Sequence, residues 1–159
     1  MSMINGLPAH PFLVHFVVVL AVLTATLAVL CALWPAARQR LVWLVLALAV
    51  VTAGATPLTA ESGEWLEHRI DKTQLVEEHA ELGETMIFFA LALLVAAVLL
   101  VVAHRRRLTG ALAAGIAVFV IAASGATMYQ VYRIGDSGAK SVWHDALTTT
   151  PAVADKDDD

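Results

Sequence analysis

The sequence predicts an all-α integral membrane protein with four transmembrane helices, arranged as two repeated helical hairpins with both termini external. Of the 159 residues, 59% are hydrophobic, which is too apolar for an ordinary soluble domain. The apolar residues gather in four blocks almost free of charge, at residues 11–34, 41–60, 85–103 and 108–132. A helix needs about 20 apolar residues to cross the hydrocarbon core, and the period-two alternation of barrel strands is absent. We therefore expect one domain over residues 1–150, followed by a disordered acidic tail over 151–159.

The flanks of each block support a helix. The first block follows MSMINGLPAH, which has no basic residue, and it is longer than a signal-peptide core, so we expect it to be retained. Pro11 suits the first helical position and would place His10 at the helix cap. The second block ends near GATPLTAESGEW, and the fourth ends near GATMYQVYRIGDSGAKSVW. The third block follows EEHAELGE, whose acidic residues favour a helix start.

The arginines predict the orientation. Two short segments between blocks, residues 35–40 and 104–107, hold five arginines and no acidic residue. Dense arginine in short loops marks the cytoplasmic face, so both termini and the loop at 61–84 should lie outside. We expect a multi-pass protein of the bacterial plasma membrane, with the lipid bilayer as its partner. The acidic external loop argues against nucleic-acid binding, and small residues along the second and fourth blocks permit a homodimer.

An internal repeat relates the two halves of the chain. HPFLVH before the first apolar run resembles HAELGE before the third, and both returning blocks contain GAT. Each GAT is followed by an acid, Ser and Gly, as Glu61-Ser62-Gly63 and as Asp136-Ser137-Gly138, with four more residues between GAT and Ser-Gly in the second copy. We interpret Ser62 and Ser137 as helix-terminating residues. The halves would be related by a pseudo-twofold axis along the membrane normal.

The repeated polar residues predict a cofactor site at the external face. They are His10, His15 and Glu61 from one half and His79, Glu84 and Asp136 from the other. Imidazole and carboxylate ligands together suit a transition-metal ion, which is our first hypothesis, with all six as ligands. The alternative is a b-type haem, for which His10 or His15 would pair with His79 across facing helices. A third reading is an accessory or structural subunit with no cofactor.

Helix geometry restricts this site. Residues five apart on an ideal helix point about 140° apart, so His10 and His15 converge only if His10 lies outside the helix, and the same problem applies to His79 and Glu84. The sequence contains no Gly-rich phosphate loop, His-Glu-x-x-His pattern or nucleophile elbow. It therefore indicates no enzyme class.

Three motifs, HPFLVHF, the His of HAELGE, and YRIGDSGAKSVW, resemble the predicted bacterial membrane proteins of domain-of-unknown-function family 2231. The resemblance spans residues 7 to 143 and implies a four-helix integral membrane protein. Relatives of this kind can be joined to Rieske-type or other redox domains, so the resemblance also implies a possible redox partner protein. The family's last motif often reads Gly-His-Ser-Gly, whereas this chain has Asp136 in place of that His.

Overall fold

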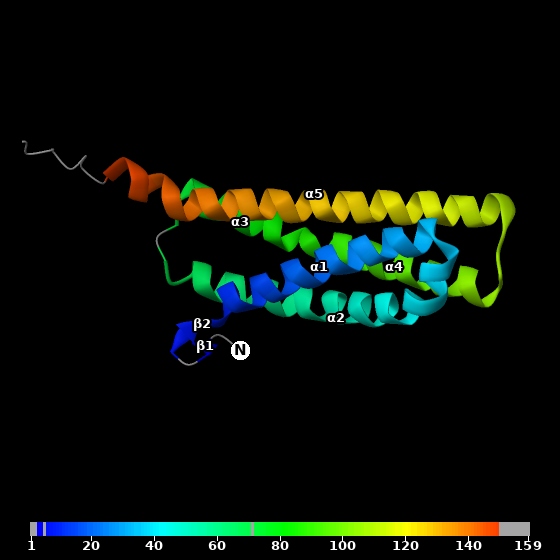
Figure 1. Cartoon of the computed structure of the whole chain (residues 1–159). Coiled ribbons are helices and arrows are strands. Elements are labelled where there is room, and N and C mark those ends of the chain that lie inside the picture. Colours follow the sequence, from blue (N-terminus) through cyan, green and yellow to red (C-terminus); the bar gives the residue numbers. More distant parts are fainter. Residues whose placement is uncertain (1–2, 5, 71, 150–159) are drawn as a thin grey trace, which may run out of the picture.

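The computed structural model describes residues 3–4, 6–70 and 72–149. In that part of the chain a short antiparallel strand pair precedes five helices (Figure 1). The elements are β1 (Met3–Ile4), β2 (Leu7–Pro8), α1 (Ala9–Leu33), α2 (Pro35–Glu67), α3 (Gln74–Glu84), α4 (Met86–Arg105) and α5 (Gly110–Thr149). Four helical segments are long and apolar enough to cross a membrane, with α3 and α4 counting as one segment. This confirms the predicted all-helical membrane fold with four spans; the tail at 151–159 falls outside the described residues.

The helices are longer than the apolar blocks. α2 begins at Pro35, because proline suits a first helical position, so the predicted loop at 35–40 is helical. α2 also continues to Glu67, and α3 begins at Gln74, which reduces the predicted loop at 61–84 to residues 68–73. α5 likewise runs past Ser137 to Thr149. The interpretation of both Ser-Gly pairs as helix ends is therefore wrong: they lie within helices.

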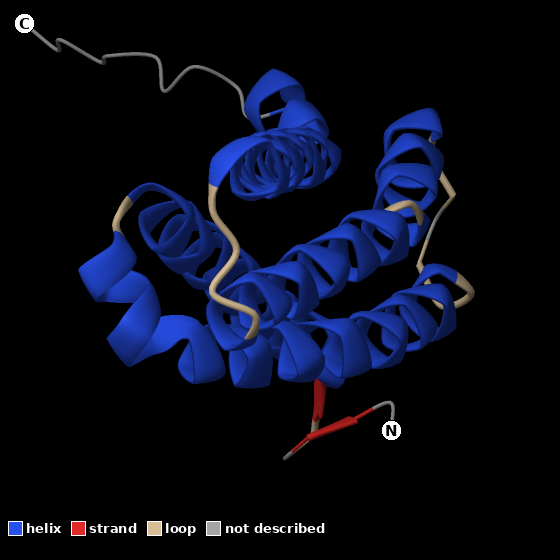
Figure 2. Cartoon of the chain, turned by 90° about the vertical axis from the view of Figure 1, so that its right-hand side faces the viewer, coloured by secondary structure: helices blue, strands red, loops and turns tan. Residues whose placement is uncertain are grey.

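The helices form a four-cornered bundle (Figure 2). α1 and α4 each pack against both α2 and α5. α2 and α5 therefore lie diagonally opposite one another in the bundle. The core between them is rich in small side chains, including the fully buried Ala21, Ala25, Ala49, Ala96 and Ala97. Because lipid supplies no hydrophobic drive between helices, such small residues stabilise the bundle by close backbone approach.

The two ends of the bundle differ in charge. The α1–α2 junction and the α4–α5 loop lie at one end, where Arg38 Nε donates to the Cys31 carbonyl at 3.0 Å and Arg105 stacks over Trp43 at 5.1 Å. The strand pair, the α2–α3 connection and the C-terminal part of α5 lie at the other end (Figure 1). Which end faces the outside stays a prediction.

Candidate functional site

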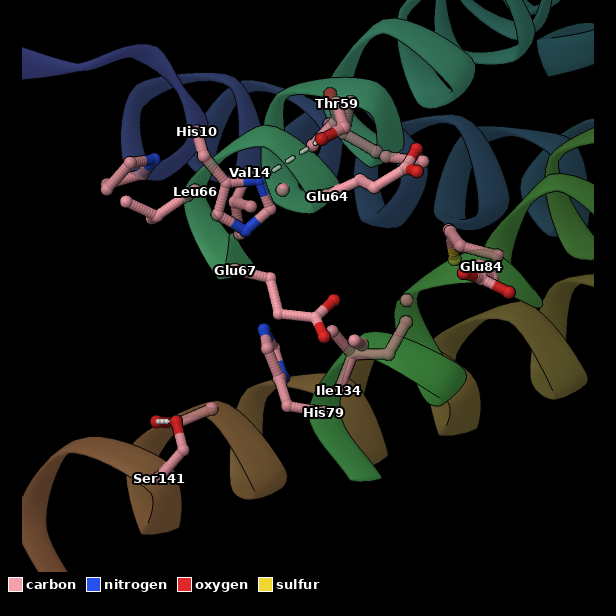
Figure 3. Close-up of a pocket in the computed structure, with 18 of the residues that line it drawn as sticks. His10, Val14, Thr59, Glu64, Leu66, Glu67, His79, Glu84, Ile134 and Ser141 are labelled. Carbon is pink, nitrogen blue, oxygen red and sulfur yellow. Dashed lines mark hydrogen bonds between the residues drawn. The ribbon is translucent and has the colours of Figure 1, made fainter. Parts of the chain in front are cut away.

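A cavity of ≈ 570 Å³ lies between α1, α2, α3 and α5, at the end of the bundle that holds the α2–α3 connection. Its walls are mostly apolar and include Val14, Val18, Val76, Met86 and Ile134. Cavities that bind organic cofactors are typically about 300–1,000 Å³, with apolar walls and a few placed polar groups. Here the ionisable groups are two histidines and several glutamates (Figure 3).

His10 reaches the cavity from the first turn of α1. Its Nδ1 lies 3.1 Å from the Thr59 carbonyl and 3.3 Å from Ser62 Oγ, both on α2. A carbonyl oxygen can only accept, so Nδ1 must carry the proton and donate. The Ser62 hydroxyl donates its own proton to the same Thr59 carbonyl at 2.7 Å, which leaves Oγ as a second acceptor for the imidazole.

His79 is held in the same way from α3. Its Nδ1 lies 3.0 Å from Ser137 Oγ on α5, and the Ser137 hydroxyl donates to the Ile134 carbonyl at 3.0 Å. Because the hydroxyl proton is directed to that carbonyl, Oγ accepts from the imidazole. We therefore assign the proton of His79 to Nδ1 as well.

With both protons on Nδ1, each imidazole keeps an unprotonated Nε2 with a free lone pair. Figure 3 shows the rings of His10 and His79 facing one another across the cavity. A histidine whose Nδ1–H is held by a second group and whose Nε2 is bare has the arrangement typical of metal-ligating histidines. Each of the two side chains thus keeps one nitrogen lone pair that is not used by a hydrogen bond to the protein.

Glycines allow each imidazole to lie against a helix. A Cβ at Gly63 would meet His10 Cε1 at 2.8 Å, and a Cβ at Gly138 would meet His79 Cε1 at 3.0 Å. Both distances are shorter than ordinary van der Waals contact. Each Ser-Gly pair therefore forms a cradle, in which the serine accepts from Nδ1 and the glycine leaves room for the ring.

Carboxylates complete the lining. Glu61, Glu64, Glu67 and Glu84 line the cavity, and of these only Glu67 is shielded from solvent, with a side chain 18% exposed. Its carboxylate pairs with Lys72 Nζ at 2.8 Å and projects between the two imidazoles in Figure 3. Over the described residues, no group of three or more His, Cys, Asp or Glu side chains converges closely enough to hold a metal ion.

The cavity brings together four of the six predicted ligands, namely His10, His79, Glu61 and Glu84. The sequence predicts His10 at the helix cap, and this prediction is wrong. α1 begins at Ala9, so His10 lies within the first helical turn. The expected separation of about 140° then turns His15 away from the cavity.

The structure places the other two predicted ligands outside the cavity lining. His15 is exposed, and its Nδ1 bonds to the Pro11 carbonyl of its own helix. Asp136 is exposed on α5 and pairs with Lys140 Nζ at 2.6 Å.

The sequence interpretation missed the residues that hold the imidazoles. Ser62, Ser137 and the glycines after them were recognised as a repeated pattern but were interpreted as helix ends. The signal that could have identified them is the repeat itself, because the same small pair recurs with a histidine in each half.

The family model described as "Predicted membrane protein (DUF2231)" matches residues 6–151. The match covers the whole bundle, including both histidines and both Ser-Gly pairs. No curated protein and no solved structure matches the chain.

Proposed function

This chain belongs to the DUF2231 family of predicted membrane proteins, and we propose that it binds a b-type haem between His10 and His79. The observation that carries this proposal is the pair of imidazoles that line one largely apolar cavity. Nδ1 of His10 is hydrogen-bonded to α2, and Nδ1 of His79 is hydrogen-bonded to α5, so that Nε2 of each ring stays available. Helical bundles hold cofactors through side chains on facing helices. The residues present suit such a group, because the cavity offers two imidazole nitrogens and mostly apolar walls.

The chemistry that a bound haem supplies is one-electron transfer. The residues of this chain would hold and orient it: His10 and His79 would bind the iron, and Ser62 and Ser137 would fix the tautomers of these histidines. An iron held by two protein nitrogens would favour electron exchange over oxygen binding. The proposed role is therefore a membrane-embedded electron carrier with a redox partner protein.

A second candidate is a transition-metal ion held by His10, His79 and Glu67. The support for it is that the Glu67 carboxylate lines the same cavity as the two rings. Two imidazoles and a carboxylate suit several divalent ions. The absence of a converged three-ligand group among the described residues favours haem over this alternative, since a haem needs only the two nitrogens from the protein.

We further propose that the halves form a structural repeat around this cavity. The support is that His10 with Ser62 and Gly63 matches His79 with Ser137 and Gly138 in both the serine hydrogen bond and the glycine contact. Counted back from the two serines, the fully buried Thr52 and Thr127 both lie ten residues upstream. This alignment needs no insertion, whereas pairing the two GAT strings needs four extra residues.

We propose that the cavity end faces the outside of a bacterial plasma membrane. The support is the arginine-rich opposite end, formed by the α1–α2 junction and the α4–α5 loop. Arginine in short loops favours the cytoplasmic side.

The test is an absorption spectrum, with elemental analysis, of protein purified in mild detergent without a His tag. We expect a Soret band and stoichiometric iron, lost in His79→Ala and kept in His104→Ala, since His104 lies at the far end of α4. His15→Ala should also keep the band. A stoichiometric metal without a Soret band would support the metal-ion candidate. Neither metal nor band would leave the cofactor-free accessory subunit as the remaining reading.

A further inference from the structure

Gln130 on α5 is a buried amide at the point where the third membrane-spanning segment is broken. The side chain is 2% exposed. Its Nε2 donates to the Leu82 carbonyl at 3.1 Å and to Thr85 Oγ1 at 2.7 Å. Thr85 is the single residue between α3 and α4, and its hydroxyl also donates to the Leu82 carbonyl at 2.7 Å. The amide thus joins α5 to the last turn of α3.

A buried amide in a membrane bundle is costly unless its polar atoms are bonded. A helix break exposes backbone groups that need partners outside the regular ladder. Here the Leu82 carbonyl satisfies both requirements, because it accepts hydrogen bonds from the side chains of Gln130 and Thr85. The bonds therefore stabilise the break at one fixed place and one fixed angle.

The break determines where His79 lies. Leu82 follows His79 by about one helical turn, and Ser137, which holds the imidazole, follows Gln130 by about two turns of α5. α3 is therefore attached to α5 at two points by side-chain hydrogen bonds. Because α3 has no fully buried residue, apolar packing alone fixes its position weakly.

The first half lacks this attachment. Seven residues before Ser62, at the place that matches Gln130, the chain has Ala55. The corresponding helix α1 runs without a break from Ala9 to Leu33. One imidazole is thus carried by a continuous helix, and the other by a short helix that needs a second anchor.

We infer that Gln130 is a positioning residue for His79: it sets the angle of α3 through Leu82 and Thr85, and so fixes how far the imidazole reaches into the cavity. Its effect on the cofactor rests on the proposed function. Its effect on α3 does not, and can be measured without any cofactor.

The experiment measures the distance between spin labels on Glu81→Cys and Phe12→Cys, two exposed positions on α3 and α1, in a Cys31→Ala background. The parent should give one narrow distance distribution. Gln130→Met has a similar length but no amide donor, and it should give a broadened or shifted distribution. Gln74→Met, the same replacement at an exposed residue, is the matched control and should resemble the parent.

A Gln130→Met distribution equal to that of the parent would overturn the inference, whatever the cofactor does. If that variant does not fold, variants of the exposed Thr85 test the inference in its place. Thr85→Val should broaden the distribution and Thr85→Ser should not, and equal behaviour of the two would also overturn the inference. Where haem is present, the same samples should show altered low-spin g values in Gln130→Met. Broadening in a protein without haem would support the positioning role and count against the proposed cofactor.

Discussion

Replacing Gly63 with alanine is expected to displace the His10 imidazole. The new Cβ would lie 2.8 Å from Cε1 and 3.0 Å from Nδ1 of the ring, and ordinary contact begins at 3.4 Å. The ring must therefore retreat from α2. Because its Nδ1 already lies 3.1 Å from the Thr59 carbonyl and 3.3 Å from Ser62 Oγ, the retreat stretches both hydrogen bonds beyond bonding range.

The expected cost follows from three contributions. Overpacking costs about 1–3 kcal/mol, and the lost hydrogen bonding costs about 0.5–1.5 kcal/mol. Alanine regains about 1 kcal/mol of helix propensity over glycine. The free energy of unfolding should therefore fall by about 0.5–3.5 kcal/mol. Gly54→Ala, on the same helix with no atom within 4 Å of the added Cβ, should instead be neutral or stabilising by up to about 1 kcal/mol.

The assay is reversible unfolding of both variants in mixed micelles, together with haem content per protein. Opposite signs for the two alanines are the expected result, with haem loss confined to Gly63→Ala. Gly138→Ala provides a second test, since its Cβ would lie 3.0 Å from His79 Cε1. The cradle argument would be refuted if Gly63→Ala were as stable and as fully loaded as Gly54→Ala.

Three further predictions address the serines, the acid of the last motif and the topology. Ser137→Ala should weaken haem binding about 10–100-fold in titrations, because it removes the group that holds the second imidazole. Ser124→Ala on the same helix should not, since that hydroxyl has no partner among the described residues. Asp136→Ala should leave haem occupancy unchanged, and a clear loss would show that it acts as a ligand after all. In intact cells a cysteine at Gln74 should react with a membrane-impermeant thiol reagent, and one at Gln39 should not. The reverse pattern would show that the membrane orientation is opposite to the predicted one.

The sequence predicts the four spans well because hydrophobicity and length determine membrane insertion. It does not predict helix ends, because helices in this protein continue beyond the apolar blocks. Glu61 and Ser62 directly follow the apolar block, yet α2 continues through both. Their polarity was interpreted as a loop, whereas Ser62 bonds back to its own helix and to His10.

The two histidines of the candidate site could be identified from residue type and repetition, but the geometry could not. The sequence alone does not distinguish His10 from His15, because both are histidines near the start of the same helix. The position of the helix start decides which one lines the cavity. With α1 beginning at Ala9, His10 faces α2 and His15 faces outward. Glu67 could not be distinguished from the other acids, since its place in the cavity lining depends on how far α2 extends. The break at Thr85 has no proline signal, because it is set by Gln130, which is distant in sequence.

Each imidazole is held by its own half of the chain: His10 by Ser62, and His79 by Ser137. The cavity lies between the halves, which otherwise meet along α1 with α5 and α2 with α4. Whatever binds both Nε2 atoms therefore acts as a cross-link between two separately built units. A ligand present at 1,000 times its dissociation constant adds about 4.1 kcal/mol to the stability of the state that binds it. That free energy would oppose separation of the two hairpins. The packing between the two halves of the chain should therefore be most stable when the cavity is filled.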